Sequence, residues 1–210
     1  MSVAGSFNGD IVVNGAARIS GDITPLRARA SILAQADLQE FVIPWSWWRQ
    51  HDAFATPLAA AAADDDLGLV GGAFGTDHPT IQTGDLKNAG ATTRYARAVI
   101  PLPWEYVSGQ TVTLRFHAGM ITTVASTSAT LDLVAYESDG ELGLSADLCA
   151  TDAKNINSLT FADFDFSITP TGLVAGDELD VRIAIAINDA ETGTPVIGCI
   201  GKASLLCDVR

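Results

Sequence analysis

The chain has 210 residues, of which 48% are hydrophobic and 18% are charged, a balance that fits a folded chain and argues against disorder. Its formal net charge of −13 and isoelectric point of about 4.3 leave no basic stripe for a phosphate backbone, so we expect no nucleic-acid partner. No long apolar run is present and residues 1–10 lack the regions of a signal peptide, so we expect no membrane partner and synthesis in a cytoplasm.

Residues 1–37 differ in composition from the rest of the chain. Asn-Gly and Ser-Gly pairs divide residues 8–23 into short predicted strands, and residues 26–37 are ambiguous between helix and strand. Large apolar side chains are too few here to offset an ordering cost of about 1–2 kcal/mol per residue. We therefore interpret residues 1–37 as an extended N-terminal β arm and linker that orders against another surface. Its candidate interface residues are Phe7, Ile11, Val13, Ile19 and Ile23.

Strand signals dominate from residue 38 onward. Residues 39–45, 47–54 and 67–74 have β-rich compositions, and residues 75–93 are rich in turn formers, which predicts a long loop. Six further β-rich runs are separated by Gly, Asp and Pro, and they cover residues 94–102, 111–118, 129–136, 158–168, 178–187 and 195–209.

Alternation within these runs predicts sheets with one buried face. Val112, Leu114 and Phe116 share one face of their run, and five apolar residues from Leu179 to Ile187 repeat at period two. About nine strands, long loops and almost no helix predict an all-β fold, an antiparallel β-sandwich of the jelly-roll type over residues 38–210. An immunoglobulin-like sandwich is the alternative.

The cluster Trp45-Ser46-Trp47-Trp48 is the most informative short motif. In a strand, Trp45 and Trp47 would share one face and Trp48 would lie on the other. The favoured interpretation puts Trp45 and Trp47 in the core and Trp48 at its rim. A subunit interface and a surface that stacks on sugar rings are the alternatives, so Trp45, Trp47 and Trp48 are also candidate interface residues.

Catalytic and metal-binding motifs are absent from the sequence. It contains no nucleophile elbow, phosphate-binding loop, dinucleotide-binding loop or zinc-binding helix. Of three scattered histidines, His117 is expected to be half-exposed on a strand. Residues 64–66 are three aspartates that could bind calcium, but they lack the spacing of an EF-hand loop, which favours a solvated acidic loop. We expect no enzymatic activity, no metal and no cofactor.

Cys149, Cys199 and Cys207 are too few to form a disulfide framework and are expected to be reduced thiols. If residues 195–208 form one continuous strand, Cys199 and Cys207 share a face about 26 Å apart, too far to bridge.

Two phrases resemble structural proteins of tailed bacteriophages: residues 100–120, ending in Gln-Thr-Val-Thr-Leu-Arg-Phe-His-Ala-Gly-Met, and residues 170–183. They are similar in style to capsid decoration (cement) proteins, and residues 7–23 resemble the short-strand segments of trimeric phage fibres. The resemblance implies a non-enzymatic homotrimer on the capsid exterior, bound to the major capsid protein or another virion protein.

Two other functions stay open. A fibre or receptor-binding protein would contact a host glycan or protein through the tryptophan cluster and residues 75–93. A carbohydrate-active enzyme would need two carboxylates facing each other across a cleft, and the sequence does not select such a pair.

Overall fold

The computed structural model describes residues 37–138, 140, 142–191 and 193–210. The predicted arm and its candidates Phe7, Ile11, Val13, Ile19 and Ile23 lie outside these residues. The described elements are β1 (Asp37–Val42), a 3-10 helix η1 (Trp45–Trp47), β2 (Gly68–Val70), β3 (Thr80–Gln82), β4 (Gly90–Pro101), β5 (Val112–Ile121), β6 (Ser128–Ser138), β7 (Lys154–Asn155), β8 (Ala162–Ile168), β9 (Glu178–Asp189) and β10 (Ile197–Val209). No helix among them is long and apolar enough to cross a membrane.

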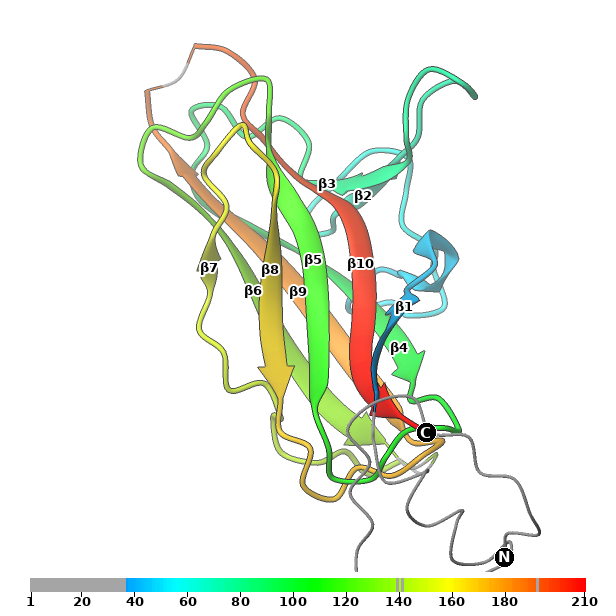
Figure 1. Ribbon diagram of the computed structural model, residues 1–210. Coiled ribbons are helices and arrows are strands. Elements are labelled where there is room, and N and C mark those ends of the chain that lie inside the picture. The colour runs from blue at the N-terminus through cyan, green and yellow to red at the C-terminus, as the bar shows by residue number, and fades with distance from the viewer. Residues whose placement is uncertain (1–36, 139, 141, 192) are drawn as a thin grey trace, which may run out of the picture. The chain divides into compact units, whose positions relative to one another are not determined.

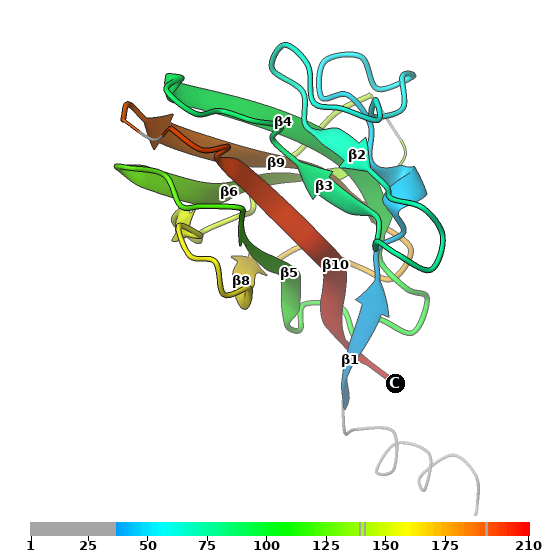
Figure 2. The ribbon, with the colours of Figure 1, turned by 90° about the horizontal axis from the view of Figure 1, so that it is seen from above.

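The ten strands form two antiparallel sheets packed face to face (Figure 1). The first sheet has the order β2-β3-β10-β5-β8, and β1 also pairs with β10; the second has the order β4-β9-β6-β7. In Figure 2, β1 lies along β10 at the margin of the first sheet.

The pairing is that of one long hairpin rolled into a sandwich. β3 pairs with β10, β4 with β9, β5 with β8 and β6 with β7, so each pair is nested inside the previous one. The contacts β10–β5 and β9–β6 then join the pairs within each sheet. This is the strand order of a jelly roll, which confirms the predicted fold class and removes the immunoglobulin-like alternative.

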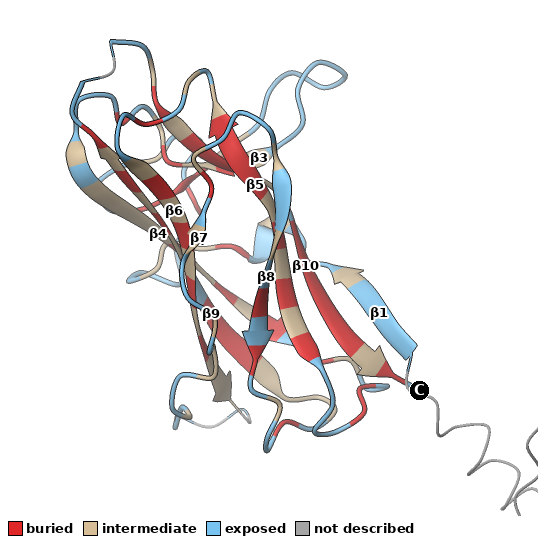
Figure 3. Ribbon diagram, turned by 60° about the vertical axis from the view of Figure 1, so that its left-hand side comes forward, coloured by how far each residue is buried: buried red, intermediate tan, exposed pale blue. Residues whose placement is uncertain are grey.

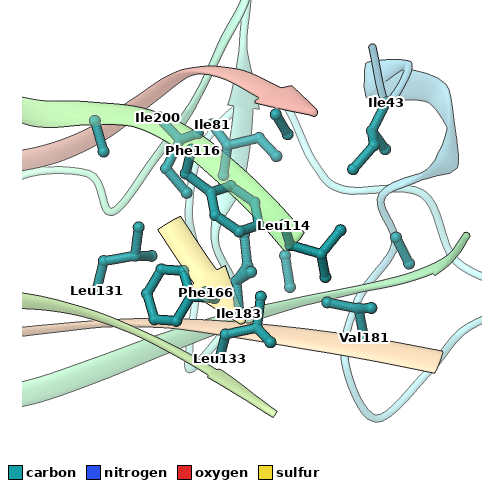
Figure 4. Close-up of a cluster of buried hydrophobic side chains, with 14 of the residues drawn as sticks. Ile43, Ile81, Leu114, Phe116, Leu131, Leu133, Phe166, Val181, Ile183 and Ile200 are labelled. Atoms are coloured by element: carbon teal, nitrogen blue, oxygen red, sulfur yellow. The ribbon is translucent and has the colours of Figure 1, made fainter. Parts of the chain in front are cut away.

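The core lies between the sheets and follows the alternation seen in the sequence. Along β5 and β9 the inward positions are buried and the outward ones are more exposed, as the banded colouring of Figure 3 shows. Phe116 packs edge-on against Phe166 at a centroid distance of 5.9 Å, and Ile183 approaches from the opposite sheet (Figure 4). The predicted inward rows of β5 and β9 are confirmed.

The first predicted strands fit less well. Residues 47–54 form no strand, because the chain turns at Pro44 into η1 and continues as a loop tied to β4 by an isolated bridge between Arg49 and Arg97. Residues 75–93, expected to be a loop, contain β3 and the start of β4.

A β-bulge in β10 reverses the expected orientation of one cysteine. Ile200 pairs with Ala118 and Lys202 with His117, which leaves Gly201 as the extra residue. Ile200 and Cys207 both lie in the core, whereas Cys199 is buried outside it. The two cysteines therefore lie on opposite faces, and the prediction that they share one was wrong.

Candidate functional site

An apolar groove lies beside β1, where η1 and the end of β4 meet the first sheet. Its volume is about 400 Å³. It is lined by Phe41, Val42, Ile43, Pro44, Trp47, Ile100, Pro101, Leu102, Pro103, Trp104 and Leu205, and we call it the β1 groove. None of these side chains is titratable, so the groove offers contact area and no acid, base or nucleophile.

Trp47 and Trp48 are oriented opposite to the favoured prediction, whereas Trp45 is partly buried and packs against the core. Trp48 is 1% exposed and packs edge-on against Phe116, whereas Trp47 is 38% exposed and lines the groove. The reason is the 3-10 geometry of η1, in which residues three apart lie on one side of the helix. Trp45 and Trp48 therefore face the body together, and Trp47 faces outward.

Trp104 is the main groove residue that the sequence reading missed. It is 82% exposed and lies in the turn that follows β4, where the Tyr106 N–H donates to the Pro103 carbonyl over 2.9 Å. Its indole lies against Gly176, where an added Cβ would come within 2.8 Å of the ring. The sequence could have indicated it, because Trp104 follows two prolines in a turn, outside the alternating positions that form the core.

β1 leaves an unpaired edge beside this groove. It pairs with β10 along one side, and no described strand pairs with its other side. Val42 at its end is 63% exposed, and most of the strand is coloured as exposed in Figure 3. Glu40 is held by Lys202 of β10, whose hydrogen bond lowers the pKa of that carboxyl group. An unpaired strand edge presents N–H and C=O groups to which another strand can bind.

No histidine or acidic side chain lines the β1 groove. His117 is half-exposed on β5, as predicted, and lies 2.7 Å from Asp163 of β8. His51 lies 3.2 Å from Asp66 and 3.5 Å from Asp65, so this part of the acidic triplet is tied to a histidine. His51, Asp52 and Asp66 can each bring one ligand atom within 4.8 Å of the others.

All three cysteines are free thiols. Burial raises the pKa of Cys207 to about 11 and also raises the pKa values of Cys149 and Cys199. Thiols with raised pKa values stay protonated at neutral pH and are poor nucleophiles.

No family model matches the chain, and no curated protein sequence matches it. Among solved structures, the CBM22-1 xylan-binding domain of Paenibacillus barcinonensis Xyn10C has 11% identity and a TM-score of 0.41, over 83% of this chain and 96% of that domain. An infectious bursal disease virus chain (Gx strain) has 12% identity and a TM-score of 0.37, over 82% of this chain and 33% of that one.

The enzymatically active domain of tailspike protein 4 from bacteriophage CBA120 has 10% identity and a TM-score of 0.34, over 84% of this chain and 20% of that one. The structural neighbours thus include viral capsid, phage tailspike and carbohydrate-binding chains. At these TM-scores the likenesses carry no information on function.

Proposed function

We propose that this chain is a non-enzymatic virion structural protein that decorates or cements a phage capsid from the exterior, and that the β1 groove and the β1 edge are its subunit contact surface. The observation that carries the proposal is the joining of an apolar groove, an 82%-exposed Trp104 and an unpaired strand edge on one surface. Tryptophans at the centre of interfaces often dominate the binding energy.

The occupant we propose is a neighbouring copy of the same chain, in a homo-oligomer for which the phage resemblance favours a trimer. A strand of the neighbour would add to the β1 edge through main-chain hydrogen bonds, and an apolar side chain would fill the groove between Trp47 and Trp104. Residues 1–36 precede β1 in the sequence, and fully extended they would span at most roughly 130 Å. That reach suffices to contact an adjacent subunit or the major capsid protein.

For the alternative, a fibre or receptor-binding protein, the tryptophan cluster and residues 75–93 do not form the expected contact surface. Trp48 is in the core and Trp45 is half-buried, so the three tryptophans do not form one platform for a glycan. Residues 75–93 contribute β3 and the buried Leu86 to the body of the sandwich. A glycan would therefore need another surface.

The contact surface is tested with Trp104→Ser and Val42→Asp in the full chain. We expect each variant to shift sedimentation from an oligomer toward a monomer, with a melting temperature close to that of the wild type, because both side chains are exposed in the single subunit. Leu159→Ser is the matched control: Leu159 is 57% exposed in another loop, and its replacement should leave the oligomer intact.

The virion role is tested on purified particles with gold-labelled antibody against the chain. Label on the capsid exterior is the expected result. A wild-type protein that stays strictly monomeric at high concentration and does not bind empty capsids would overturn the proposal.

A further inference from the structure

A second hollow surface lies on the outer face of the other sheet, away from the β1 groove. β4, β9 and β6 run side by side there, and their register places Arg97, Arg182 and Val134 in one row. Rows on either side bring in Asp180 and Tyr136 toward one end, and Tyr95, Ala184 and Asp132 toward the other.

Two cavities lie along these rows and share Arg182 in their lining. One has a volume of about 220 Å³ and is lined by His51, Arg97, Tyr136, Leu144, Asp180 and Arg182. The other, of about 280 Å³, extends past Tyr95 and Asp132 to Thr93, Thr130 and Ala153. Together they form what we call the sheet trough, which covers four rows and is roughly 20 Å long at ~3.3 Å per residue.

The polar groups of the trough are held in place by their neighbours. Asp180, which is buried, accepts two hydrogen bonds from the Arg97 guanidinium, one of them over 2.6 Å from Nε. The same guanidinium lies 5.1 Å above the Phe54 ring. The Arg182 guanidinium lies 5.1 Å above the Tyr95 ring. Groups that are already fixed lose little conformational freedom when a ligand binds.

Two side chains of the trough keep their bonding capacity. In the described part of the chain, the Arg182 guanidinium contacts the Tyr95 ring but has no hydrogen bond or ion pair, so its N–H donors are free for a ligand. The Tyr136 side chain, among the same residues, has no hydrogen bond or ring partner, and Leu144 lines the same cavity. The trough therefore combines an aromatic ring, a fork of donors and the acceptor oxygens of Asp132.

The charges favour a neutral ligand. The lining contains two arginines and two aspartates, which balance formally, and the whole chain carries −13, which repels polyanions. Arg97 is already neutralised by Asp180. A pyranose ring has apolar C–H faces that stack on aromatic rings and pairs of hydroxyls that match bidentate donors and acceptors.

We infer that the sheet trough binds a neutral oligosaccharide, with Tyr136 and Leu144 contacting a sugar face, Arg182 donating to sugar hydroxyls and Asp132 accepting from them. Arg97, fixed by Asp180 and Phe54, shapes one end. This role is independent of the β1 groove, and it supplies a surface for host-glycan contact that the tryptophan cluster does not.

The test is affinity electrophoresis of the full chain in native gels that contain arabinoxylan, galactomannan or dextran, with polygalacturonate as an anionic polysaccharide. We expect retardation by at least one neutral polysaccharide and none by polygalacturonate. Arg182→Ala and Tyr136→Ala should each weaken that binding at least tenfold, while Tyr136→Phe should retain most of it. Arg115→Ala, which removes an arginine from the outer face of the first sheet, is the matched control and should bind like the wild type.

Two results would overturn the inference. One is the absence of retardation by all three neutral polysaccharides, or retardation that Arg182→Ala and Tyr136→Ala leave unchanged in proteins with wild-type melting curves. The other is a change in sedimentation mass on Arg182→Ala without a change in retardation, which would make this face a subunit contact. Neither result depends on Trp104 or Val42, so the two proposals fail separately.

Discussion

Ile183 and Arg182 are neighbours in β9 with side chains in opposite environments. Ile183 is fully buried between the sheets, whereas Arg182 is exposed on the outer face. Ile183→Asp should prevent soluble expression, because burying an unpaired carboxylate among apolar side chains costs several kcal/mol. Arg182→Glu should give soluble protein whose unfolding free energy lies within about 1 kcal/mol of the wild type. Equal yields and melting curves for the two variants would contradict the placement of β9.

Thr122 has a φ of 75°, in the left-handed region that β-branched residues rarely adopt. Its side chain is exposed, so replacement removes no core contact. Thr122→Gly should stabilise the fold by about 1 kcal/mol, since release of strain of ~1–3 kcal/mol exceeds the entropy that glycine adds to the unfolded chain.

A melting temperature raised by about 2–4 °C is the expected readout for a domain of this size. The matched control is Thr123→Gly, because Thr123 has no positive φ and its replacement should lower the melting temperature. A lower melting temperature for both variants would show that the turn at Thr122 is not strained.

At the scale of elements, sequence alternation predicts the long strands well and the short ones poorly. β5 and β9 are recognisable because one face is buried over ten residues or more, which imposes a period of two. β3 and β7 are three and two residues long, too short for a period to be read, and their pairing depends on β10 and β6 from distant parts of the chain.

The side chains whose orientation was predicted wrongly each follow one local irregularity of the backbone. In Trp45-Ser46-Trp47 the letters alternate as in a strand, but Pro44 starts a 3-10 turn whose period of three puts Trp48 in the core. One extra residue at Gly201 reverses every later side chain of β10, and only the paired strand β5 reveals it.

The candidate sites depend on neighbours that sequence order does not reveal. Trp47 was a candidate from the start, but its groove partner Trp104 lies 57 positions later, and the jelly-roll order brings them together. In the same way, Tyr95, Tyr136 and Arg182 become one surface only because β9 lies between β4 and β6. Nested long-range pairing is set by the whole chain, so local composition carries little signal for it.

At the scale of the whole molecule, the nested pairing of β3 to β10 encloses the core of residues 37–210. The buried apolar residues of this described part come from both sheets, and the first of them is Ile43. Among the described residues the sandwich therefore has a complete set of inward-facing rows, and the role proposed for residues 1–36 is contact with other subunits.

Deleting residues 2–24 tests whether these residues serve attachment and not the stability of the sandwich. The melting temperature should change by no more than a few degrees, because the segment carries too little apolar surface to offset its own ordering cost. Attachment to the particle should be lost or sharply weakened, measured by co-sedimentation of the protein with empty capsids. Trp104→Ser in the full chain provides the comparison, since it alters the β1 groove while residues 2–24 stay in place. Hydrogen exchange on the wild-type protein can contradict the docking role. Strong protection of the Ile11 to Val13 amides in a demonstrated monomer would place the segment in the fold of the single subunit, and the docking role would be withdrawn.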